Sequence, residues 1–161
     1  MDDHGMETSG VTREQRALAV LRLALGALFV WVFFENLGKG AYTPAGYKGV
    51  IDYYVKNGHS PGAWKALISV AAANARIVAP LQAATELGFG VLLLAGVATR
   101  VVAAAAGAFL FTLWVSELGT SWVWELGIPV IVAFCVAGGR AGRTWGVDAV
   151  LARRLPGWRL G

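Results

Sequence analysis

The chain has 161 residues, of which 57% are hydrophobic and only 15% charged, and its mean hydropathy is +0.57. Soluble domains carry about 25% charged residues, so this composition excludes an ordinary soluble protein. The net charge is +4, but the basic residues flank apolar segments, which argues against a nucleic-acid partner. The single cysteine, Cys135, can form neither an intrachain disulfide nor a Cys-x-x-Cys redox pair.

Uncharged apolar segments of this chain are long enough to cross a hydrocarbon core of ~30 Å. They predict an all-α integral membrane protein whose domain, residues 17–139, is a four-helix transmembrane bundle. The expected spans are residues 17–34, 78–98, 101–116 and 122–139. The acidic, polar segment 1–16 has no apolar periodicity and is expected to be a flexible cytoplasmic tail.

The first span is interrupted by Arg22, which lies six residues after Arg16 and therefore roughly 9 Å along the helix. The favoured interpretation is that Arg22 snorkels to the inner headgroups. The alternative is that it faces the bundle and pairs with a carboxylate or with a substrate anion.

A long outer loop is expected at residues 35–77, carrying short interfacial helices near Tyr47–Lys56 and from Ala63 to Ile77. It is rich in tyrosine, and a loop of this length commonly covers a cavity. After the last span, residues 140–161 predict a cytoplasmic amphipathic helix, since Val147, Val150 and Leu151 form an apolar stripe beside Arg153 and Arg154.

Orientation follows from the basic residues outside the spans. With four spans, eight of them share one side with both termini: Arg13, Arg16, Arg100, Arg140, Arg143, Arg153, Arg154 and Arg159. Five lie on the other side: Lys39, Lys48, Lys56, Lys65 and Arg76. The chain is therefore expected to be a multi-pass protein of the cell inner membrane with both termini in the cytoplasm.

The segment from Glu86 to Arg100 has nearly the same pattern as the segment from Glu125 to Arg140. Each arginine marks the cytoplasmic end of a span, so both glutamates are expected roughly 21 to 23 Å above that boundary, in the outer third of the bilayer. Carboxylates at this depth are expected to face the bundle interior, paired, hydrated or protonated. For Glu117 and Glu125, however, a position at the membrane interface is the favoured interpretation.

Glu86 is the most informative of these carboxylates, because apolar residues flank it on both sides. It is either a structural ion pair between helices or a functional carboxylate, a catalytic candidate, in an outward-facing cavity under the long loop. The cations expected at its height are Lys39 and Arg76, and Gln82 lies one turn away. With Arg22 and Glu125 these residues form the candidate substrate-binding set. No spacing of metal ligands is present, so no metal is predicted.

Three segments together resemble the DoxX family: Leu21 to Phe29 with Lys39 downstream, Glu86 to Arg100, and Gly138 to Arg140 followed by Trp145 to Asp148. The segment from Pro61 to Pro80, with Asn74 and Arg76, is closer to the DoxD-like branch. That branch includes the small membrane subunit of thiosulfate:quinone oxidoreductase. The resemblance covers roughly residues 17–152.

The resemblance implies a four-helix membrane subunit of a quinone-linked oxidoreductase, with Glu86 near the quinone and Arg22, Lys39 or Arg76 handling anions. In the DoxD case it implies oxidation of thiosulfate to tetrathionate, with quinone as the electron acceptor and a second subunit as partner. A different hypothesis is a non-catalytic membrane anchor or assembly partner for another redox or respiratory complex. A solute transporter is a third hypothesis, and its four helices would have to oligomerise to make a path.

Overall fold

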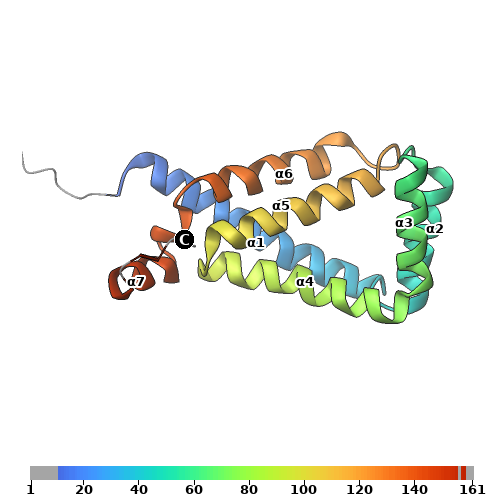
Figure 1. The fold of residues 1–161 in the computed structure, drawn as a ribbon, viewed down its shortest axis with the longest axis horizontal. Helices are drawn as coiled ribbons and strands as arrows, with labels where there is room; N and C mark the ends of the chain where they lie inside the picture. Colours follow the sequence, from blue (N-terminus) through green and yellow to red (C-terminus); the bar gives the residue numbers. More distant parts are fainter. Residues whose placement is uncertain (1–10, 156, 159–161) are drawn as a thin grey trace, which may run out of the picture.

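The computed structural model describes residues 11–155 and 157–158, and in these residues the regular elements are all helical. Long helices run side by side along the molecule (Figure 1). They are α1 (Arg13–Gly38), α4 (Ala75–Ala95), α5 (Thr99–Ser116) and α6 (Val123–Gly138).

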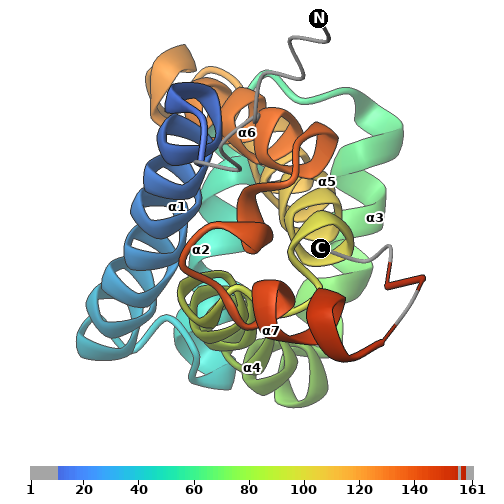
Figure 2. The ribbon, with the colours of Figure 1, turned by 90° about the vertical axis from the view of Figure 1, so that its left-hand side faces the viewer.

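Shorter helices close the two ends of this bundle (Figures 1 and 2). At one end, α2 (Pro44–Asn57) and α3 (Gly62–Ala73) lie across the long helices, and we call this the Glu86 end. At the opposite end lie the 3₁₀-helix η1 (Ala141–Arg143) and α7 (Val147–Arg154), and we call this the Arg22 end.

Helices α1, α4 and α5, with 26, 21 and 18 residues, are each long and apolar enough to cross a membrane. The protein is therefore an all-helical membrane protein. Helix α6 is also apolar but has only 16 residues, which is about 24 Å at 1.5 Å per residue. It packs along α5 and α1, and its role as a fourth span stays a prediction.

The helix boundaries differ from the expected spans by a few residues. Helix α1 begins at Arg13 inside the expected tail, because Thr12 and Gln15 form a capping box. Most of that tail, residues 1–10, lies outside the described residues. In the long loop, Asn74 ends α3 at Ala73 and α4 starts at once, so the helix expected to reach Ile77 is divided between the two.

Glycines set the closest contact between α1 and α4. A Cβ atom on Gly90 would lie 2.7 Å from Val30 Cγ2 and 3.1 Å from the Val30 backbone nitrogen. A Cβ atom on Gly26 would lie 2.9 Å from Leu94 Cγ and 3.1 Å from the Gly90 carbonyl oxygen. Small residues let membrane helices approach closely and gain dispersion contacts, so this pair holds the two helices backbone to backbone.

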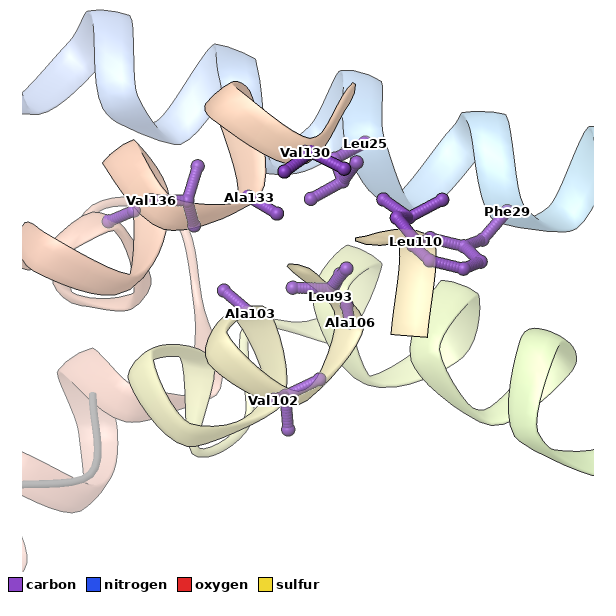
Figure 3. Packing of buried hydrophobic residues seen from close by; sticks show 11 residues of the cluster. Leu25, Phe29, Leu93, Val102, Ala103, Ala106, Leu110, Val130, Ala133 and Val136 are labelled. Carbon is purple, nitrogen blue, oxygen red and sulfur yellow. The ribbon is translucent and has the colours of Figure 1, made fainter. Parts of the chain in front are cut away.

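The core of the bundle is filled by apolar side chains from four helices (Figure 3). Ala103, Ala106 and Ala133 are completely buried where α5 meets α6, because small side chains let the two helices approach closely. Towards the Glu86 end, Phe29 packs edge to face against Phe89 with ring centroids 5.5 Å apart. The core is therefore built from small side chains at the Arg22 end and from aromatic side chains nearer the Glu86 end.

Arg22 is completely buried and its guanidinium binds backbone carbonyls. Nη1 donates to Leu93 O (3.0 Å), and Nη2 donates to Thr144 O (3.4 Å) and Trp145 O (3.1 Å). The expectation that Arg22 snorkels to the headgroups is therefore wrong. The alternative is correct in that Arg22 faces the bundle. Its partners, however, are carbonyl oxygens at the end of α4 and in the segment before α7, and not a carboxylate or an anion.

Asp148 on α7 caps the start of α5. Its carboxylate accepts hydrogen bonds from the backbone nitrogens of Ala98 and Thr99, each at 2.9 Å, and from Trp158 Nε1 at 3.0 Å. A carboxylate at a helix N-terminus satisfies free N–H groups and the helix dipole. Helix α7 thus lies where an amphipathic helix was expected, with Val147 and Val150 exposed, but Asp148 also attaches it to the bundle.

The start of α3 is attached to the end of α5. Ser60 Oγ donates to Val115 O (2.7 Å), Trp64 Nε1 donates to Ser116 Oγ (3.0 Å), and the backbone nitrogen of His59 donates to Leu118 O (2.6 Å). The first of these bonds occupies a carbonyl group that the C-terminus of α5 leaves without a helical partner, and the other two attach to the Ser116 hydroxyl and to the turn that follows α5. Helices α2 and α3 therefore form a fixed cap over the Glu86 end.

Replacing Gly90 by alanine is expected to lower the free energy of unfolding by about 1–3 kcal/mol, because the new methyl group would press on Val30 and separate α1 from α4. Gly88→Ala on the same helix is the matched control, since its Cβ would have nothing within 4 Å. It should be neutral or stabilising. Unfolding by SDS titration in detergent micelles measures both, and equal stability of the two variants would contradict the assigned contact.

Asp148→Asn is expected to cost about 2–3 kcal/mol, because an asparagine cannot accept hydrogen bonds at both of the positions now facing N–H groups. Asp52→Asn should change stability by less than about 0.5 kcal/mol, since Asp52 pairs with Lys48 on the exposed surface of α2. The same titration compares the two. A loss no greater for Asp148→Asn than for Asp52→Asn would show that α7 is not anchored in this way.

Candidate functional site

A partly open cavity of about 610 Å³ lies at the Glu86 end, lined by residues of α1–α6 and of the loop between α1 and α2. Its walls are mainly apolar and include Trp64 from the cap and Phe109 from α5. Its polar lining residues are Asn36, Lys39, Tyr47, Tyr54, Gln82, Thr85, Glu86, Thr112, Ser116 and Glu117. A mostly apolar cavity with a few converging polar groups is the usual form of a small-molecule site.

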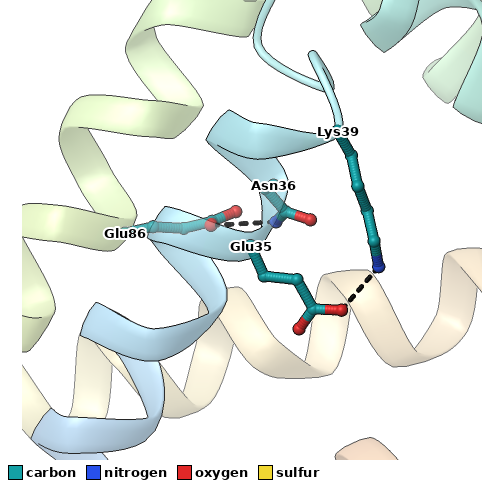
Figure 4. Close-up of polar contacts among 4 residues, drawn as sticks. All are labelled: Glu35, Asn36, Lys39 and Glu86. Atoms are coloured by element: carbon teal, nitrogen blue, oxygen red, sulfur yellow. Dashed lines mark hydrogen bonds and ion pairs between the residues drawn. The ribbon is translucent and has the colours of Figure 1, made fainter.

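Glu86 on α4 is the most enclosed polar group of this cavity, with only 1% of its surface exposed. Its Oε1 accepts a hydrogen bond from Gln82 Nε2 (2.8 Å) and its Oε2 accepts one from Asn36 Nδ2 (3.3 Å; Figure 4). Tyr42 OH also donates to Oε2. Within the described residues no lysine or arginine nitrogen lies within 4.0 Å of this carboxylate.

Tyr42 reaches Glu86 from the loop between α1 and α2. Its ring stacks on Phe33 with centroids 5.5 Å apart, which fixes the direction of the hydroxyl. Burial, and then hydrogen bonding to Glu86, raises the pKa of Tyr42 above its ordinary value. Tyr42 therefore keeps its proton at physiological pH and acts as a hydrogen-bond donor.

A second carboxylate, Glu117 at the end of α5, borders the same cavity. Its Oε1 accepts from Tyr54 OH (2.9 Å) and its Oε2 accepts from Ser121 Oγ (3.0 Å). Burial, reinforced by the Glu117 charge, raises the pKa of Tyr54, so this tyrosine is also a stable donor. Both carboxylates are thus held by neutral donors.

The structure brings only part of the predicted site together. Gln82 and Lys39 line the cavity with Glu86, but Lys39 pairs with Glu35 (2.6 Å) and not with Glu86 (Figure 4). Arg76 is exposed at the start of α4 and does not line this cavity.

The other two candidates lie elsewhere. Arg22 is bound to carbonyls at the opposite end of the bundle. Glu125 is exposed in the first turn of α6 and is not among the lining residues. The interpretation of Glu86 as half of an interhelical ion pair is wrong within the described residues, because its partners are two amides and a phenol.

Sequence reasoning did not identify Asn36, Tyr42 and Tyr54 as parts of the site. For Asn36 a signal was present, since it lies seven residues after the buried Phe29 and so falls on the same face of α1. Tyr42 and Tyr54 carry no such signal, because the positions of loop and cap residues depend on tertiary contacts.

Comparison with known proteins gives one match. The sequence model of the DoxX family matches residues 17–117, more than half of the chain. This range includes Glu86 and the partners of its carboxylate, and it ends at Glu117. No curated protein and no solved structure matches the chain. By the extent of the family match, the chain belongs to the DoxX family.

Proposed function

We propose that the protein is the membrane subunit of a quinone-linked oxidoreductase and that the cavity around Glu86 binds the quinone ring. The observation that carries this proposal is a buried carboxylate with no cationic partner within the described residues, held by Tyr42, Asn36 and Gln82 at the wall of a cavity of about 610 Å³. Membership of the DoxX family supports the same class of function.

The lining residues suit a quinone. A quinone ring is flat, uncharged and apolar on its faces, and its two carbonyl oxygens accept hydrogen bonds. The cavity offers the apolar and aromatic surfaces of Trp64, Phe109 and Leu113, and it offers N–H donors from Gln82 and Asn36. A cavity of this volume falls within the range of about 300–1,000 Å³ that is typical of small-molecule sites.

When bound, the quinone would supply the capacity to accept two electrons and two protons. Glu86 is the group that can hold and deliver a proton, because it is a carboxyl group at the cavity wall and its hydrogen-bond partners are neutral donors. Tyr42 orients Glu86 and retains its own proton. Asn36 and Gln82 fix the carboxyl group so that one oxygen faces each amide.

Electrons must come from a donor outside this chain. If thiosulfate is that donor, as in the DoxD-like branch, two thiosulfate ions yield one tetrathionate and two electrons. The cavity is unsuited to this dianion, because its lining holds the carboxylates of Glu86 and Glu117 against one lysine that is already paired. We therefore place thiosulfate oxidation on a partner subunit and only the quinone site in this chain.

Glu86→Gln is expected to leave binding of a decyl-substituted benzoquinone within a few-fold of the unaltered protein, because the amide preserves the size and a hydrogen-bonding group. Reduction of that quinone in membranes supplied with thiosulfate should fall by about 10²–10⁴-fold, the usual contribution of an acid–base group. Equilibrium binding to the purified protein and absorbance of the quinone during turnover measure the two quantities.

Glu125→Gln is the matched control and should change neither quantity, because Glu125 is exposed and outside the cavity. Glu86→Leu should weaken quinone binding tenfold or more, since it leaves three buried donors without an acceptor. The proposal fails if the unaltered protein neither copurifies with quinone nor binds the added one. Recovery of a stable partner complex in that case would favour the non-catalytic anchor.

A further inference from the structure

A second, outer pocket of about 490 Å³ adjoins the Glu86 cavity. The two share four lining residues: Gly46, Val50, Tyr54 and Glu117. Tyr53, Thr120 and Ser121 border the outer pocket and are not among the lining residues of the cavity. The wall between the two spaces is therefore built around the hydrogen bond from Tyr54 OH to Glu117 Oε1, at 2.9 Å.

This wall has the properties of a gate. It depends on one hydrogen bond between side chains of α2 and the end of α5. The neighbouring α2 positions, Gly46 and Gly49, have no side chains that would block the outer pocket if the Tyr54 ring rotated into it. Glu117 itself stays in place when this bond opens, because Ser121 Oγ holds its other oxygen at 3.0 Å.

The opposite side of the cavity is closed by phenylalanines. Phe109 lines the cavity, and its ring lies 5.8 Å from Phe89 and 6.4 Å from Phe29, measured between centroids. Phe29 is 3% exposed. Leu25, Leu93 and Leu110 lie in the same buried cluster (Figure 3). A layer of this composition offers water no polar partner, so it separates the cavity from the Arg22 end.

The charged residues that line the cavity and the outer pocket determine which ions can enter them. Glu86 and Glu117 are the acidic lining groups and Lys39 is the basic one. Lys39 is compensated by Glu35 at 2.6 Å. A cleft lined by charge of one sign concentrates ions of the opposite sign, so this access route favours cations over anions.

We propose that the Tyr54–Glu117 pair is a gate that connects the Glu86 cavity to water on the α2–α3 side of the membrane only. It admits water, protons and small cations and disfavours anions. The proposal concerns access to the cavity and holds whether or not a quinone binds there. Its consequence for chemistry is that any proton exchanged by Glu86 comes from, or returns to, the side on which α2 and α3 lie.

Cysteine accessibility tests the gate in lipid vesicles. The background is Cys135→Ser, which removes the single native thiol. Gln82→Cys places a thiol beside Glu86, and Ser116→Cys, a closer match in size, is a second reporter at the cavity wall. Asn57→Cys and Arg154→Cys, both exposed and at opposite ends of the molecule, report which side a reagent has reached. The reagents are membrane-impermeant methanethiosulfonates, one cationic and one anionic.

The cavity thiol is expected to react only with reagent on the side that labels Asn57→Cys, and faster with the cationic reagent. Tyr54→Phe removes the gate's hydrogen bond and should raise the cationic rate by about fivefold or more. Glu117→Gln should reduce the preference for the cationic reagent. Tyr53→Phe is the matched control and should leave the rate unchanged, because Tyr53 borders only the outer pocket of these two spaces.

Several results would overturn the proposal. They are labelling of the cavity thiol from the side that labels Arg154→Cys, equal rates with the two reagents, an unchanged rate in Tyr54→Phe, or no labelling of either reporter in Tyr54→Phe. A normal gate together with absent quinone binding would reject only the quinone site. Quinone binding with two-sided labelling would reject only the gate.

Discussion

The buried guanidinium of Arg22 is the interaction on which the arrangement of the bundle depends. Inside a bilayer a cation must find its partners within the protein, and Arg22 finds them at the end of α4 and in the segment before α7. Gly96 makes room for it: the residue is left-handed, with φ +68°, and a Cβ there would clash with Arg22 Nη1. Asp148 then fixes the start of α5 beside it.

The hydrogen bonds of Arg22 at one end of α4 also determine the direction in which Glu86 points at the other end. The Leu93 carbonyl is held by Arg22, so the rotation of α4 about its own axis is fixed. Glu86 lies seven residues before Leu93 and seven after Ala79, both completely buried, and residues with this spacing share one face of a helix. Gly90 brings the same face against α1. Glu86 is thus turned inward by packing, although an isolated carboxylate would favour water.

The sequence was sufficient to predict the long apolar helices, because hydropathy needs no knowledge of neighbouring residues. The depth of Glu86 in the bilayer stays a prediction. The sequence placed Glu125 in the binding set, but the residue lies outside the cavity, because distance along a helix does not say which face a residue occupies. Glu125 lies three residues before Ile128, which is 58% exposed, and shares its outward side. The prediction that Arg22 snorkels to the headgroups was wrong because the acceptors of its guanidinium are 71 and 122 residues away in the chain. No local sequence pattern indicates such distant partners.

The buried basic residue Arg22 and the buried acidic residue Glu86 lie at opposite ends of the bundle. At one end Nη1 and Nη2 of Arg22 donate to carbonyl oxygens, and at the other Glu86 accepts from amides and a phenol. Because the apolar core separates them, neither ionisable group can neutralise the other. The cavity therefore keeps an acidic character that Lys39, bound to Glu35, does not cancel. An acidic cavity disfavours anions and accommodates a neutral molecule. This charge is the reason for proposing a quinone in this cavity and for assigning any oxidation of thiosulfate to a different surface.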